Sequence, residues 1–274
     1  MPLPILKTTT DASPEALLRY FHQTELQWTR HTSQETQLDV GMAMHNAELR
    51  RTHAANRVLD AAVSEDLSAA EAVRLVDVHF AEVGSTCWQW VMNPSAPAVR
   101  TRPLVEYLSS LGWRRDACDV MYVDRMPTAP IAIPSDHGLT IIPARASYKH
   151  ARQLYEEAAA DWNTPELADA DVLHLEDPHV DALLALKDGR AVAHAGVLAA
   201  GEIGRIESVY VTEAMRGRGI GTLMISRAME ICARSLFKHI LLGVAPHKSS
   251  AIAVYQKFGF RKIADFVAYQ RLTR

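Results

Sequence analysis

The chain has 274 residues, of which 48% are apolar, and its formal net charge is −3. This composition excludes a disordered chain, and the charge gives no indication of nucleic-acid binding. Because no apolar run approaches the ~20 residues of a membrane-spanning helix, we expect no membrane partner.

The N-terminus and the cysteines indicate the compartment. Residues 1–11 lack a charged segment followed by an apolar run, so we expect no secretory leader. Cys87, Cys118 and Cys232 are scattered and odd in number, which argues against a disulfide framework. Both features predict a cytoplasmic protein in a reducing environment.

The first half carries two clear helix starts. Ser13 followed by Pro14 predicts a helix that reaches about Trp28. Ser68-x-x-Glu71 is a capping box, which predicts a second helix ending near Gly84. Residues 29–55 show no clean period and receive no assignment. The other predicted elements are strands at 58–63, 86–92 and 119–124, a loop at 93–97 and a helix from Pro103 to Gly112.

A proline-rich segment divides the chain. Three prolines and little periodicity predict a linker over 127–138, between domains at 1–126 and 139–274. The second domain is expected to be an α/β layered domain. Its predicted elements are a strand at 139–143, a helix at 147–161, an acidic loop at 163–178 and a hairpin of 181–187 and 191–199 around Asp188-Gly189.

The most informative stretch is Arg205–Thr222. A β-branched and aromatic strand runs into a turn with glycines at 217, 219 and 221, and apolar residues then recur at helical spacing. The first amides of a helix lack internal partners, and the helix dipole places positive charge there. Glycine lets a phosphate approach the main chain because it has no Cβ. The stretch therefore predicts a phosphate-binding turn.

Spacing excludes two common phosphate loops. A Walker loop needs Gly-Lys-Ser/Thr, but Gly221 is followed by Thr222 and Leu223. A dinucleotide fingerprint that begins at Gly217 needs a glycine at position 222. The pattern that remains is Arg216-x-x-Gly219-x-Gly221 after a strand that ends in valine.

This pattern resembles the acetyl-CoA loop of the GNAT acetyltransferase superfamily, Arg/Gln-x-x-Gly-x-Gly/Ala. Residues 238–244 read as the next strand, and 251–260 are similar to the family's Ala-Ile-x-x-Tyr-x-x-x-Gly-Phe helix and turn. The resemblance covers roughly residues 138–274, about half of the chain. It implies an α/β (α+β) fold in which a twisted mixed sheet is flanked by helices.

The first half contains an echo of this pattern. Residues 104–113 resemble the helix and turn at 251–260 and are also followed by a predicted strand. The echo predicts two GNAT-like domains in tandem, the first of them degenerate; chance similarity of one amphipathic helix is the alternative. No Arg-x-x-Gly-x-Gly occurs before residue 130, so the first copy should not bind CoA in the usual way.

The resemblance implies acetyl-CoA as co-substrate. In the family, the strand before the loop splays from its neighbour and pairs with the pantetheine arm, which here assigns that role to the backbone of Val209, Tyr210 and Val211. Lys248 stands where many members carry Asn, so it is expected to reach a CoA phosphate instead. The remaining expected cofactor-binding residues are Arg216, Gly217, Arg218, Gly219, Ile220, Gly221 and Thr222.

Two side chains are the expected catalytic residues. An aliphatic ammonium has a pKa near ~10 and must lose a proton before it attacks. Glu207 is the expected base, because period 2 places it on the face of Val209 and Val211 and polyamine acetyltransferases of the family carry a matching Glu. A residue that only binds or orients the substrate is the alternative. Tyr255 is the expected acid for the leaving thiolate, with a core aromatic as the alternative.

We therefore predict an acetyl-CoA-dependent N-acetyltransferase acting on a primary amine of a small molecule or peptide. The alternatives are a non-catalytic acyl-CoA-binding or regulatory module, and a longer acyl donor. Residues 203–274 carry a charge of +8 and the rest −11, which suits a polyanionic cofactor and leaves open a cationic substrate. We expect a monomer or homodimer. His174 and His179 lie in a predicted loop without zinc spacing, so we expect no metal.

Overall fold

The computed structural model describes residues 11–124, 138–162, 164 and 166–271. The predicted linker at 127–138 therefore lies outside the described residues, except for Gly138. The division into domains at 1–126 and 139–274 stays a prediction. Across the described parts of the chain, no helix is long and apolar enough to cross a membrane.

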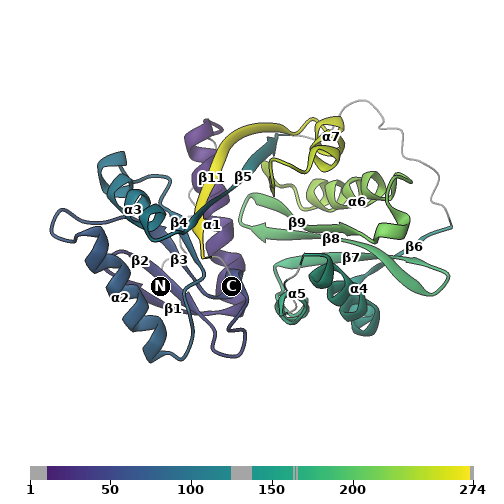
Figure 1. Ribbon diagram of the computed structural model, residues 1–274. Helices are drawn as coiled ribbons and strands as arrows, with labels where there is room; N and C mark the ends of the chain where they lie inside the picture. Colours follow the sequence, from purple (N-terminus) through teal and green to yellow (C-terminus); the bar gives the residue numbers. More distant parts are fainter. Residues whose placement is uncertain (1–10, 125–137, 163, 165, 272–274) are drawn as a thin grey trace, which may run out of the picture.

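In these residues, eleven strands form one continuous mixed sheet (Figure 1). Its order is β1-β2-β3-β4-β11-β5-β10-β9-β8-β7-β6. The strands of the first half are β1 (Gln34–Leu38), β2 (Gly41–His45), β3 (Arg57–Ala61), β4 (Gln89–Met92) and β5 (Arg114–Val123). Those of the second half are β6 (Thr140–Pro143), β7 (Val180–Lys187), β8 (Arg190–Ala200), β9 (Ile203–Val211), β10 (His239–Val244) and β11 (Arg261–Gln270).

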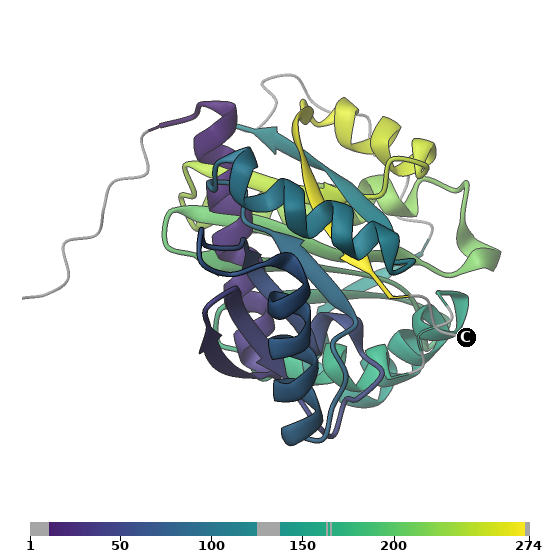
Figure 2. The same ribbon diagram turned by 60° about the vertical axis from the view of Figure 1, so that its left-hand side comes forward.

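The helices cover both faces of this sheet. In the first half they are α1 (Pro14–Thr32), α2 (Ala69–Glu82) and α3 (Ala98–Ser110). In the second half they are α4 (Tyr148–Asp161), α5 (Leu167–His174), α6 (Ile220–Arg234) and α7 (Ser249–Lys257). Helix α1 packs on one side of the N-terminal strands and α2 with α3 on the other (Figure 2). In the second half, α4 and α5 cover one face and α6 the other (Figure 1).

The two halves exchange their last strands. β5 pairs antiparallel with β10 of the second half, and β11 pairs antiparallel with β4 of the first. β5 and β11 also pair with each other over most of their length. The central strands of the sheet therefore belong to both halves, and neither half has its full set of strands alone.

The halves repeat one another in topology. In each, a parallel pair is connected by a helix, β3-α2-β4 and β9-α6-β10. In each pair an arginine, Arg57 or Arg205, lies near the start of the first strand. Three residues after this arginine the backbone has a positive φ, which is 58° at Asp60 and 50° at Ser208. A shared, costly backbone conformation at the same place supports the predicted tandem of GNAT-like units.

Three sequence predictions of the elements need correction. The acidic loop predicted over 163–178 contains α5, whose buried face includes Asp171 and His174 and so lacks an apolar period. α3 begins at Ala98, and Pro103 lies in its second turn instead of starting the helix. The unassigned residues 29–55 hold the end of α1 and the hairpin of β1 and β2.

Candidate active site

The strands β9 and β10 stop pairing partway along β9. We call the unpaired edge of β9 over residues 207–211 the opening. The parallel ladder between β9 and β10 pairs Ile203 through Ile206 with His239 through Leu242. β9 continues to Val211, and over residues 207–211 the described ladders pair it with β8 alone. In the described residues, the segment that contains Val209, Tyr210 and Val211 thus has no strand partner on its β10 side.

The turn after β9 leads directly into α6. Gly217 and Gly219 have φ of 75° and 81°, a region in which side chains other than hydrogen are strained. Gly219 is the N-cap of α6 and makes no side-chain capping hydrogen bond. The first amides of α6, at Ile220, Gly221 and Thr222, therefore lie at the positive end of the helix dipole and have no capping side chain. This geometry binds anions.

The equivalent helix of the first half is closed to an anion. The Ser68 hydroxyl accepts a hydrogen bond from the amide of Glu71 at 3.2 Å, and the Glu71 carboxylate accepts one from the amide of Ser68 at 3.1 Å. This capping box occupies the amides of Ser68 and Glu71 and places a carboxylate at the start of the helix, where it would repel a phosphate. In residues 104–113, which resemble residues 251–260, Leu108 aligns with Tyr255. Over residues 11–124, the first half therefore lacks both an uncapped helix start at α2 and the tyrosine.

Arg216 connects the turn to β9 and to α4 through hydrogen bonds. Its Nε donates to the carbonyl oxygen of Val211 at 3.0 Å, and its Nη2 lies 2.7 Å from the Asp161 carboxylate. The Tyr210 hydroxyl donates to the same carboxylate at 2.8 Å. These hydrogen bonds, from Tyr210 first and Arg216 second, hold the pKa of Asp161 below its usual range. Arg216 thus links β9 to α4, a role that the sequence did not indicate.

Two other expected cationic residues border the turn. Arg218 is exposed between Gly217 and Gly219. Lys248 is exposed at the N-cap of α7, and its charge adds to the lowering of the Asp161 pKa. Both positions suit contact with a phosphate group near the start of α6.

Glu207 does not lie on the face that the sequence predicted. Ser208 forms a β-bulge, and the register with β8 shifts between His194 and Gly196. An inserted residue turns the following side chains over, so Val209 and Val211 pack toward α6 whereas Glu207 stays on the α1 side. The prediction that Glu207 shares their face is therefore wrong.

A buried ion network holds Glu207 in place. Its carboxylate contacts Nε of Arg205, which is 4% exposed. The Arg205 guanidinium also pairs with Glu25 of α1, and Nη2 of Arg57 lies 2.7 Å from the other Glu25 oxygen. Burial alone would raise the pKa of Glu25, but the two guanidiniums outweigh it and hold the pKa at about 2. Glu25 thus joins the equivalent arginines of both halves.

Glu25 is not among the site residues predicted from the sequence, although its position carries a signal. Glu25 follows Leu17 and Phe21 at helical spacing and so lies on the buried stripe of α1. An acid on such a stripe requires a buried partner.

Tyr255 lies on α7 in the core between α6 and the central strands. Its ring meets that of Phe260 edge-on, with centroids 6.1 Å apart. Burial raises the pKa of its hydroxyl to about 12, so it stays protonated at neutral pH. Tyr255 is on the α6 side of the sheet and Glu207 on the α1 side, so the two residues lie on opposite faces.

Comparison with known proteins finds likeness to acetyltransferases in the second half of the chain. Residues 148–260 match the model of the Acetyltransferase (GNAT) family. Over 110 residues the chain is 26% identical to a putative ribosomal protein bS18-alanine N-acetyltransferase of Bacillus subtilis (strain 168), covering 39% of this chain and 72% of that protein.

Solved structures extend the likeness of fold to both halves. A GCN5-related N-acetyltransferase from Kribbella flavida is 17% identical with a TM-score of 0.64, covering 94% of this chain and 96% of that one. A functionally unknown conserved protein from Staphylococcus epidermidis ATCC 12228 is 12% identical with a TM-score of 0.53, covering 88% and 95%.

Proposed function

From the premise that the C-terminal half of this chain is a GNAT acetyltransferase domain, we propose that the protein transfers an acetyl group from acetyl-CoA to a primary amine. One observation carries the proposal: the uncapped start of α6 lies at the end of the β9 segment that has no β10 partner. An open strand edge that is followed along the chain by an uncapped helix start suits a ligand with an extended arm and a diphosphate.

The first step of the proposal is cofactor binding. The amides of residues 218–222 hold the diphosphate of CoA, with Arg218 and Lys248 contributing charge. The pantetheine arm extends along Val209, Tyr210 and Val211 as an added strand would. An amide of this segment then polarises the thioester carbonyl.

The second step is proton removal and attack. The ammonium of the acceptor passes one proton through water to the Glu207 carboxylate, and the free amine attacks the carbonyl carbon. The contact with Nε of Arg205 orients the Glu207 carboxylate, which then passes the proton on to solvent.

The third step is departure of the thiolate. As the carbon–sulfur bond breaks, the Tyr255 hydroxyl donates a hydrogen bond to sulfur, and the proton lost by the new amide balances the one taken up by CoA. Because its pKa is about 12, Tyr255 stabilises the developing thiolate chiefly as a neutral donor.

The proposal is tested by following thiol release from acetyl-CoA with a panel of primary amines, secondary amines and alcohols. We expect release with primary amines and the matching acetylated product by mass spectrometry. Binding of CoA without release on any amine would favour a non-catalytic acyl-CoA-binding module and contradict the proposal.

Gly221 offers a direct test of the phosphate site. An added Cβ there would meet only Val211 Cγ2, at 3.9 Å, so the fold should accept a side chain. In Gly221→Asp, we expect roughly tenfold to hundredfold weaker CoA binding by calorimetry, because a carboxylate at the helix start competes with the diphosphate.

Gly221→Ala is the matched control, since it adds the Cβ without the charge. It should bind CoA within a few-fold of the unchanged protein. Equal affinity of both variants would place the diphosphate elsewhere.

A further inference from the structure

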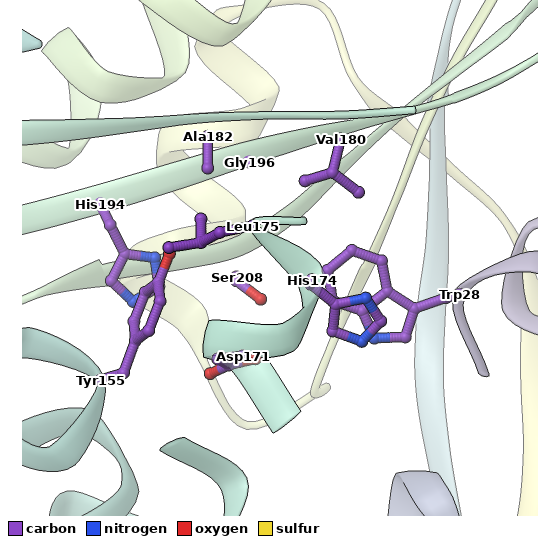
Figure 3. A pocket seen from close by; sticks show the side chains of 10 residues that line it. All are labelled: Trp28, Tyr155, Asp171, His174, Leu175, Val180, Ala182, His194, Gly196 and Ser208. Carbon is purple, nitrogen blue, oxygen red and sulfur yellow. The ribbon is translucent and has the colours of Figure 1, made fainter. Parts of the chain in front are cut away.

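A small cavity lies beneath the β9 bulge, on the face of the sheet away from α6. Its volume is about 20 Å³, enough for one group of the size of a water molecule. Figure 3 shows Trp28 and His174 on one side, Tyr155 and His194 on the other, and Asp171 with Ser208 between them. The Trp28 and His174 rings stack with centroids 3.5 Å apart, so α1 of the first half supplies one wall.

Three polar side chains line this cavity, and two of them carry a buried nitrogen without a hydrogen bond. Asp171 is 8% exposed, and within the described chain its carboxyl group has no hydrogen bond or ion pair. Nδ1 of His174 and Nε2 of His194 are also buried and lack a hydrogen bond there. Because buried polar groups are nearly always satisfied, two unsatisfied nitrogens beside a carboxyl group that has no described partner indicate a ligand.

The charges of these groups favour a cation. Burial raises the pKa of Asp171 to about 7, so the carboxyl can ionise at neutral pH if a counter-ion enters. Burial lowers the pKa of His174 and of His194 to about 3, so both imidazoles are neutral and each can present an acceptor nitrogen. A primary ammonium has three N–H donors and fits a carboxylate and two neutral imidazoles.

The cavity is separate from the opening where the thioester would lie. Val180 and Ala182 of β7, His194 and Gly196 of β8, and Ser208 of β9 line it, and no residue of β10 does. Neighbouring strands are roughly 4.8 Å apart, so a group above β8 is about 7 Å from the gap beyond β9. A cation in the cavity is therefore a different group from the amine that reacts.

We propose that this cavity binds a second ammonium group of the acceptor, with Asp171 as its counter-ion, so that the acceptor is a diamine with a short alkyl spacer. The inference rests on the proposed function and names its substrate class. Trp28 of α1 ties this specificity to the first half of the chain.

The test compares 1,4-diaminobutane with butylamine, which share one carbon chain. For the unchanged protein we expect kcat/KM to be roughly tenfold or more higher with the diamine, mainly through KM. In Asp171→Asn this ratio should fall to near one. Asp169→Asn is the matched control on the same helix, because Asp169 is exposed and pairs with Arg152, and it should keep the ratio.

Equal rates with both amines in the unchanged protein would overturn the inference and leave the cavity to a buried water. An unchanged ratio in Asp171→Asn would overturn it as well. If CoA binds but no amine reacts, the proposed function fails, and calorimetry of 1,4-diaminobutane with the CoA complex then decides the inference. Binding that Asp171→Asn abolishes would support it, and no binding to the unchanged protein would overturn it.

Discussion

Replacement of Glu25 by alanine is expected to lower the free energy of unfolding by about 3–5 kcal/mol, because it leaves two buried guanidiniums without a counter-ion. Arg57 and Arg205 are 5% and 4% exposed, and each pairs with one oxygen of the Glu25 carboxylate. Urea denaturation at pH 7 measures the change. Since these arginines belong to different halves, the loss should affect the whole sheet in one transition.

Glu35→Ala is the matched control for this prediction. Glu35 pairs with Arg30, and both side chains are about half exposed. Such a pair contributes roughly 0–1 kcal/mol, so the control should change stability little. If Glu25→Ala cost no more than Glu35→Ala, the buried network would not hold the halves together.

The stabilisation by Glu25 also has a pH signature. Its pKa in the folded protein, about 2, lies below its ordinary value of 4.5. The contribution is therefore complete above pH 4.5 and is lost as the pH falls toward 2. Over that window the unchanged protein should lose stability faster than Glu25→Ala.

The second large effect is expected on turnover: Tyr255→Phe should lower kcat roughly a hundredfold, since it removes the donor to the leaving thiolate. Phenylalanine keeps the ring packing against Phe260. In the described residues, the Tyr255 hydroxyl makes no hydrogen bond that the variant would break. Steady-state kinetics with acetyl-CoA should therefore show a lower kcat with nearly unchanged KM and melting temperature.

Tyr107→Phe is the control, because Tyr107 lies on α3, the counterpart of α7 in the first half. It should retain full turnover. If Tyr255→Phe also retained it, Tyr255 would be a core aromatic and the thiolate would take its proton from elsewhere.

The sequence alone predicted the parts of the molecule that depend on neighbouring residues. Gly217, Gly219 and Gly221 indicated a glycine-rich turn, and the apolar period after them indicated α6. Ser68 and Glu71 predicted their own capping box. These features follow from backbone sterics and local hydrogen bonds, which operate within a few residues, and that is why the glycine-rich turn and the family resemblance could be recognised in the sequence.

Tertiary structure alone decided the arrangement of the two halves and of the groups around the opening. The exchange of β5 and β11 depends on ladders between residues more than 100 positions apart, for which no local pattern exists. The bulge at Ser208 reverses the faces of β9, so the period of two misplaced Glu207. Glu25 pairs with two arginines, and Asp171 lines one cavity with Trp28, only because folding brings distant segments together. The burial of these charged groups away from water makes their partners decisive.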